Sequence, residues 1–177
     1  MIVVSDTTPL NYLILIESVH VLPALFGRVY APSAVIHELA HPRSPEPVRR
    51  WTDSLPEWLT VQEPTRIEPS LRLGSGEAAA IALAEELKAD WVLVDERKGS
   101  REAERRGFRV AGTLGIIEEA GARNLLDYEH TCDRLVVETT FYVTDDVLRE
   151  SERRFRDRKL DQELTEQKQG DEPRGRS

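Results

Sequence analysis

Two short apolar runs, each closed by an aspartate and each followed by a helical stretch, constrain the fold of this chain more than any other feature. Residues 2–5 precede Asp6, and residues 91–94 precede Asp95. Apolar runs of this length, rich in β-branched residues, are typical of strands buried on both faces. Strands that alternate with helices predict a three-layer α/β/α sandwich around a parallel sheet of about five strands. The remaining strands are expected at residues 28–31, 58–62 and 109–111.

Helix start and stop signals place helices between these strands. Thr8 followed by Pro9 is typical of an N-cap and a first helical position, which would leave Asp6 without a capping role. The strongest helical run covers residues 77–88 and follows a Gly-Ser-Gly turn. Further helices are expected over residues 19–26, 32–41, 97–106 and 112–122, and from 145 to about 155.

The length and composition suit one domain with a single core. Of the 177 residues, 40% are hydrophobic. We expect that domain over residues 1–155, followed by a charged, disordered tail over residues 156–177, where apolar residues are almost absent. The single cysteine, Cys132, excludes a disulfide framework and a cysteine-based zinc site. No apolar run approaches the ~18 residues of a membrane span, and no basic region precedes the first one, so we expect a cytoplasmic protein without membrane contact.

The charge balance argues against a passive nucleic-acid-binding module. Lys and Arg number 24 against 32 Asp and Glu, which gives a net charge of −8. Residues 151–177 carry 8 basic and 7 acidic side chains, which leaves 16 and 25 in residues 1–150. Electrostatic affinity for nucleic acid rests on Lys and Arg that neutralise phosphates. Such an acidic domain could still act on nucleic acid if several of its carboxylates held a divalent cation.

Four acids are expected at one edge of the sheet. Asp6 and Asp95 end strands, and ligands of open α/β sheets bind at the carboxyl ends of strands. Glu38 and Glu77 lie on helices that would begin near the same edge. Carboxylates gathered there would repel one another unless a hard cation lay between them, and Mg²⁺ and Mn²⁺ prefer oxygen ligands. Because such a cation activates water and offsets phosphate charge, the pattern indicates phosphodiester hydrolysis.

Each acid taken singly also has a structural interpretation. Asp6 or Asp95 could cap the helix that follows it, and Glu77 suits a helix N-terminus because the helix dipole favours anions there. Glu38 could be an ordinary exposed helix acid. The loose G-x-G-x-x-A pattern that starts at Gly74 also resembles a dinucleotide-binding turn, but the residues before it lack the strand pattern that such a turn requires.

The four acids stand in four distinct motifs. These read Val-Val-Ser-Asp6-Thr-Thr-Pro, Ala-Val-Ile-His-Glu38-Leu, Leu-Gly-Ser-Gly-Glu77-Ala-Ala and Val-Leu-Val-Asp95-Glu-Arg. In this order and spacing they resemble the PIN-domain nucleases, and more closely the VapC-like toxins and an uncharacterised prokaryotic PIN-like subfamily, over residues 1 to about 125. The resemblance implies a Mg²⁺ or Mn²⁺ site in which all four acids are catalytic and bind the metal. It also implies cleavage of RNA, a cognate antitoxin and commonly a homodimer.

Two departures from the family pattern bear on activity. The third acid of the better-studied VapC toxins is usually Asp, whereas here it is Glu77, and Arg97 stands where those toxins often have a further Asp. Thr7, Thr113 and Arg97 are additional candidates for positioning the carboxylates or contacting the substrate. Because of the two departures at Glu77 and Arg97, a catalytically weak PIN-like domain with a binding or regulatory role is the alternative function.

Overall fold

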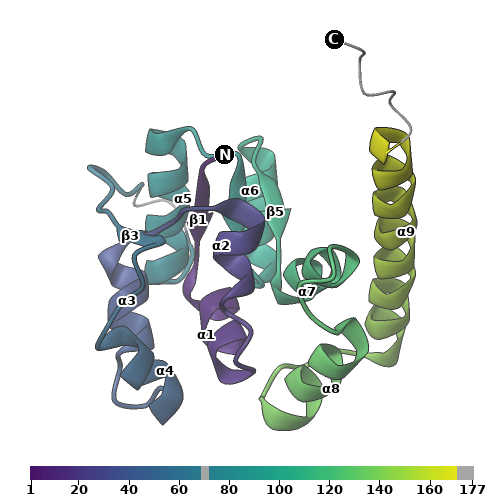
Figure 1. Cartoon of the computed structure of the whole chain (residues 1–177). Helices are drawn as coiled ribbons and strands as arrows, with labels where there is room; N and C mark the ends of the chain where they lie inside the picture. The colour runs from purple at the N-terminus through teal and green to yellow at the C-terminus, as the bar shows by residue number, and fades with distance from the viewer. Residues whose placement is uncertain (69–71, 171–177) are drawn as a thin grey trace.

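Five parallel strands form the central sheet of the computed structural model, which describes residues 1–68 and 72–170. They are β1 (Val3–Ser5), β2 (Val29–Ala31), β3 (Leu59–Val61), β4 (Trp91–Leu93) and β5 (Arg109–Ala111). Their order across the sheet is β3-β2-β1-β4-β5 (Figure 1). Because every neighbouring pair is parallel, all carboxyl ends lie at one edge, and β1 and β4 are adjacent there.

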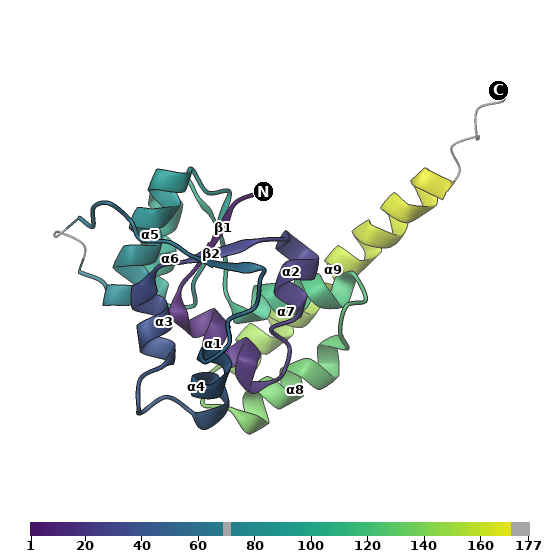
Figure 2. The same cartoon turned by 60° about the vertical axis from the view of Figure 1, so that its left-hand side comes forward.

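Helices cover both faces of this sheet, which confirms the predicted three-layer α/β/α fold class. They are α1 (Thr7–Leu15), α2 (Val21–Phe26), α3 (Ser33–Leu39), α4 (Glu46–Thr52), α5 (Ser75–Leu87), α6 (Arg97–Arg105), α7 (Thr113–Ala122), α8 (Tyr128–Glu138) and α9 (Asp145–Gly170). Successive strand residues face opposite sides. Val3 therefore belongs to the core beneath α1, α2 and α7, whereas Val4 packs beneath α5 and α6 (Figures 1 and 2). In the described part of the chain, no helix is long and apolar enough to cross a membrane.

Helix α1 begins two residues earlier than Thr8 and Pro9 predict. Asp6 is the N-cap residue and Thr7 the first helical residue. The reason lies in the sheet, because the backbone N–H of Asp6 donates to the Leu93 carbonyl at 2.8 Å and so carries the strand ladder up to the helix. Pro9 lies in the first turn, where its missing N–H leaves no helical hydrogen bond unmade.

The C-terminal part of the chain is more helical than the sequence predicts. Helix α8 is not among the expected elements, and α9 continues to Gly170, so residues 156–170 are helical rather than disordered. Arg and Glu side chains spaced three or four residues apart pair along α9, which stabilises a helix that has few apolar residues. The other part of the predicted tail, residues 171–177, lies outside the described residues.

An aromatic stack and a buried ion pair are among the contacts that fix α9 to the body. The rings of Tyr128 and Phe155 stack with centroids 4.2 Å apart. Glu118 on α7 is fully buried, and its carboxylate accepts hydrogen bonds of 2.7 and 3.1 Å from Arg154 on α9. A buried carboxylate is costly unless it is paired, so this ion pair ties the position of α9 to that of α7. Figure 2 shows the end of α9 extending away from the sheet.

We expect Arg154→Ala to lower the free energy of unfolding by about 1–3 kcal/mol, because it leaves a buried acceptor without its main donor. The matched control is Arg153→Ala on the same helix, since Arg153 pairs with Glu150 at the surface. That change should cost at most about 1 kcal/mol, which is the range for exposed pairs. Urea denaturation measures both values, and equal losses for the two variants would contradict a special role for Glu118.

Candidate active site

Asp6 occupies the centre of the carboxyl edge. It follows β1, which lies between β2 and β4, and the residue is only 3% exposed. Its side chain makes no capping hydrogen bond to α1. An acid at this position is buried because the strand that carries it is buried on both faces, and its carboxylate is held by no basic residue of the described chain.

Asp95 lies one strand away and is held from the side of β5. It follows β4, and Thr113 at the start of α7 donates to both of its oxygens. The Thr113 backbone N–H reaches Oδ1 at 2.7 Å and its hydroxyl reaches Oδ2 at 2.7 Å. Thr113 is fully buried, so these two bonds fix the plane of the Asp95 carboxylate. The sequence singled out Thr113 for such a role.

Glu38 on α3 is brought to the same edge by three donors. The Thr7 hydroxyl donates to Oε2, the Ser75 hydroxyl donates to Oε1 at 2.8 Å, and the Gly76 backbone N–H donates to Oε1 at 2.9 Å. A Cβ on Gly76 would lie 2.8 Å from Oε2 of Glu38 and 2.9 Å from the Thr7 hydroxyl. A side chain at this position would therefore displace the Glu38 carboxylate or the Thr7 hydroxyl where α5 approaches α3.

Glu77 has one oxygen engaged and one free. Oε2 accepts the backbone N–H of Gly74 at 3.1 Å, as expected for an acid in the first turn of α5. Oε1 is buried and accepts no hydrogen bond from any described residue. It lies against Gly99 on α6, where a Cβ would overlap it. A buried carboxylate oxygen without a donor is unusual, because such groups are nearly always satisfied.

Burial shifts the ionisation of this edge towards the protonated form. Burial is the main cause that raises the pKa of Asp6 to about 7. The negative charges of Glu77, Glu38 and Asp95 raise this pKa further, whereas the backbone N–H of Thr7 lowers it. Burial also raises the pKa of Glu77 and of Asp95, against the hydrogen bonds from Gly74 and Thr113.

The structure thus places the four predicted acids around one edge, within electrostatic range of Asp6. As the side chains stand, no three His, Cys, Asp or Glu of residues 1–68 and 72–170 form a group that could hold a metal ion. The donor set nevertheless fits a hard divalent cation, because it consists of carboxylate oxygens and includes the unpaired Glu77 Oε1. Asp6 and Glu77 are the two acids best able to bind one, and Glu38 and Asp95 are oriented beside them.

The remaining candidates differ in how they relate to the acids. Thr7 and Thr113 donate to Glu38 and Asp95, whereas Arg97 is exposed and makes no hydrogen bond or ion pair with any described residue. Sequence reasoning missed Ser75, which donates to Glu38 and is recognisable only as the residue before Gly76 in the first turn of α5. The positive charge of Lys98 on α6 acts on Glu77.

Comparison with known proteins gives a family. A family model described as a PIN domain matches residues 2–157 of the chain. The match extends past the region of the motifs, through α7 and α8 and into α9. A search of curated proteins finds no match.

Without metal, we expect the stability of the protein to fall as the pH rises from about 4 to about 7, because folded Asp6 keeps a proton that the unfolded chain releases. Asp6→Asn removes this dependence. The variant should therefore unfold at nearly the same free energy as wild type at pH 4 and should exceed it at pH 8, by a difference on the order of 3 kcal/mol. Urea denaturation in EDTA at both pH values measures the difference.

The matched control for this measurement is Asp53→Asn, since Asp53 is exposed at the end of α4. It should follow the wild-type pH profile. An Asp6→Asn variant that is less stable than wild type at pH 8 in EDTA would show that Asp6 serves the fold as a helix cap. It would contradict the expectation that the ionised Asp6 carboxylate destabilises the metal-free protein.

Proposed function

The chain belongs to the PIN-domain family, and on this basis we propose that it is a divalent-metal-dependent ribonuclease that hydrolyses RNA phosphodiesters. The match to the PIN-domain model itself supports a family of nuclease type. The observation that carries the proposal is the buried acidic edge. Asp6 and Glu77 offer carboxylate oxygens to which no described basic side chain donates a hydrogen bond, in a chain whose net charge of −8 repels phosphates. Such an edge can approach a phosphodiester only with a cation between them.

Each acid has a distinct part in this proposal. Asp6 and Glu77 would hold Mg²⁺ or Mn²⁺ directly, and Glu38 and Asp95 would complete the site from either side. The bound cation would offset charge on the phosphate and lower the pKa of a water molecule. Thr113 keeps the Asp95 carboxylate in one plane, and Thr7 and Ser75 do the same for Glu38. The donors are hydroxyl and backbone groups, so the negative charge of the edge stays available to the cation.

From the resemblance to VapC-like toxins we also propose a biological setting. The protein would act in the cytoplasm as the toxin of a toxin–antitoxin pair, would be held inactive by a cognate antitoxin and would form a homodimer. The alternative is a catalytically weak PIN-like binding or regulatory protein. Two observations favour it: Glu77 replaces the usual Asp, and both oxygens of Glu38 and of Asp95 already accept hydrogen bonds.

We expect the purified protein to cleave single-stranded RNA in the presence of Mn²⁺ or Mg²⁺ and to lose this activity in EDTA. Asp6→Asn and Asp95→Asn should each lower the cleavage rate by about 100-fold or more, because charge stabilisation of the transition state by a metal is worth several kcal/mol. Gel analysis of a labelled RNA, with a DNA strand of the same sequence alongside, measures both the rate and the preference for RNA.

The control variant Asp53→Asn should cleave as wild type does. If wild-type protein cleaves nothing in a mixed cellular RNA pool with either metal, the binding or regulatory function replaces the nuclease. Expression in a bacterial host tests the toxin role separately, since wild type should arrest growth and Asp6→Asn should not.

Gly99→Ala should weaken Mn²⁺ binding without changing any acid. The new methyl group would overlap Oε1 of Glu77 and push that carboxylate from its place. We expect a loss of metal affinity of about 10-fold, the lower end for changes in groups that orient metal ligands. Because alanine favours a helix by roughly 1 kcal/mol over glycine, α6 should tolerate the change. Titration calorimetry with Mn²⁺ measures the affinity.

Gly115→Ala is the matched control, because a Cβ there would meet only the Ala111 Cβ at 3.9 Å, an ordinary contact. Its Mn²⁺ affinity should equal that of wild type. A Gly99→Ala protein that melts like wild type and binds Mn²⁺ equally well would remove Glu77 from the site.

A further inference from the structure

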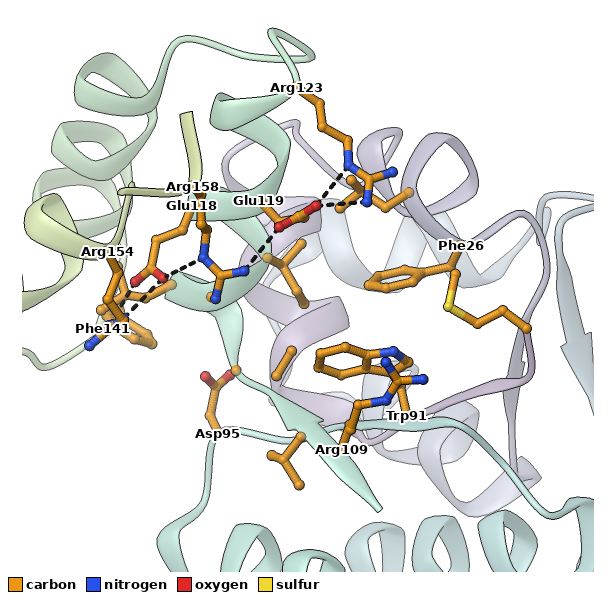
Figure 3. A pocket seen from close by; sticks show the side chains of 18 residues that line it. Phe26, Trp91, Asp95, Arg109, Glu118, Glu119, Arg123, Phe141, Arg154 and Arg158 are labelled. Carbon is orange, nitrogen blue, oxygen red and sulfur yellow. Dashed lines mark hydrogen bonds and ion pairs between the residues drawn. The ribbon is translucent and has the colours of Figure 1, made fainter. Parts of the chain in front are cut away.

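A pocket of about 520 Å³ adjoins the acidic edge along the edge strand β5. Its walls come from the sheet, from α7 and from α9, and Asp95 lies at one end of it (Figure 3). Trp91 lies towards the other end, at the start of β4. With a rise of about 3.3 Å per strand residue, the backbones of Trp91 and Asp95 are roughly 13 Å apart. The pocket is therefore continuous with the candidate active site but extends well beyond it.

One side of this pocket is a stacked platform. The guanidinium of Arg109 lies over the ring of Trp91, 4.9 Å from its centroid. Phe26 lies beside Trp91 in Figure 3 and contributes a second aromatic ring. The side chain of Arg109 is exposed and makes no hydrogen bond or ion pair with any described residue. Its outer face and its N–H groups are thus free, and planar bases stack on such guanidinium planes.

The opposite side carries three more arginines. Glu118 pairs with Arg154 at 2.7 Å, and Glu119 pairs with Arg123 at 2.7 Å and with Arg158 at 3.0 Å. With Asp95 at one end and Arg109 on the platform, three acids and four arginines line the pocket. The pocket carries excess positive charge even though the chain as a whole is acidic. Arginines are suited to phosphate groups because their planar forks bind them in two-point contacts.

We propose that this pocket binds one nucleotide of the single-stranded nucleic-acid substrate, adjacent to the position that is cut at the acidic edge. The base stacks on the Arg109–Trp91 platform, and the phosphate lies towards the arginines of α7 and α9. This inference rests on the proposed nuclease function. It gives an acidic protein a local source of positive charge for RNA, because four arginines line the pocket that Asp95 also lines.

An acidic peptide is the other ligand that arginines and aromatic rings could attract, and the geometry favours it less. The pocket has the volume of a small-molecule site, whereas stable protein partners bury roughly 800 Å² on each side. Its continuity with Asp95 also matches a substrate that passes through the acidic edge.

The test is binding of a fluorescent ten-nucleotide single-stranded RNA in EDTA, measured by anisotropy on the full chain in the Asp6→Asn background, where cleavage is blocked. Arg109→Gln should weaken binding about fivefold or more, because it removes the guanidinium plane on which the base stacks. Arg109→Lys keeps the charge but not the plane, so it should still bind more weakly.

Arg49→Gln on α4 is the matched control, because Arg49 is exposed, makes no ion pair with a described residue and lies outside the pocket. Its affinity should equal that of the parent. Both changes are at exposed residues, so the variants should fold. Equal binding by Arg109→Gln and Arg49→Gln would overturn the proposal, as would an absence of RNA binding. Binding of an oligoglutamate probe in place of RNA would also overturn it and indicate a protein partner.

Cleavage by the wild-type Asp6 protein in Mn²⁺, run in parallel, separates the two proposals. If the protein cleaves RNA normally and RNA binding does not depend on Arg109, the proposed nucleotide pocket is overturned and the nuclease function stands. Binding that depends on Arg109, without any cleavage, would support the pocket and overturn the nuclease function.

Discussion

The structure depends on the burial of carboxylates at the carboxyl end of a sheet that is covered on both faces. Asp6 is 3% exposed and has no basic partner among the described residues, whereas the fully buried Glu118 is paired with Arg154. The two acids differ in whether an arginine compensates the buried negative charge. Glu118 is neutralised and joins α7 to α9, so its role is structural. Asp6 is buried without such a partner, which raises its pKa to about 7. Residues with strongly shifted pKa values cluster at functional sites.

The groups that orient the carboxylates of the acidic edge leave their negative charge uncompensated. Thr113 and Thr7 orient Asp95 and Glu38 through hydroxyl and backbone donors, which fix a carboxylate without a full positive charge. Gly76 lets α5 approach Glu38 and Thr7 closely, and Gly99 on α6 leaves room for the Glu77 carboxylate. Positive charge is present nearby, but on the far side of Asp95, in the pocket beside β5. The separation of acids from arginines suits a reaction in which a cation and a phosphate must meet at one place.

Helix α9 connects the fold to this pocket. Its Arg154 and Arg158 belong to a helix rich in charged residues, and both form part of the pocket wall because Glu118 and Glu119 on α7 hold them there. Stacking of Phe155 on Tyr128 adds the apolar contact that a charged helix needs in order to pack. The C-terminal helix is therefore part of the architecture around the candidate site, and the PIN-domain match reaches into it.

The sequence by itself determined the parallel α/β/α fold and pointed to Asp6 and Asp95 at the strand ends, because apolar strand runs, glycines and capping residues act locally. Only the tertiary structure decided that α1 starts at Thr7, that α9 is ordered to Gly170, and that the Ser75 hydroxyl binds Glu38. In the first and third cases the partners lie far apart in sequence, as in the pair of Asp6 with the carbonyl of Leu93. A periodic pattern records which face of an element is buried, but not which distant residue meets it there.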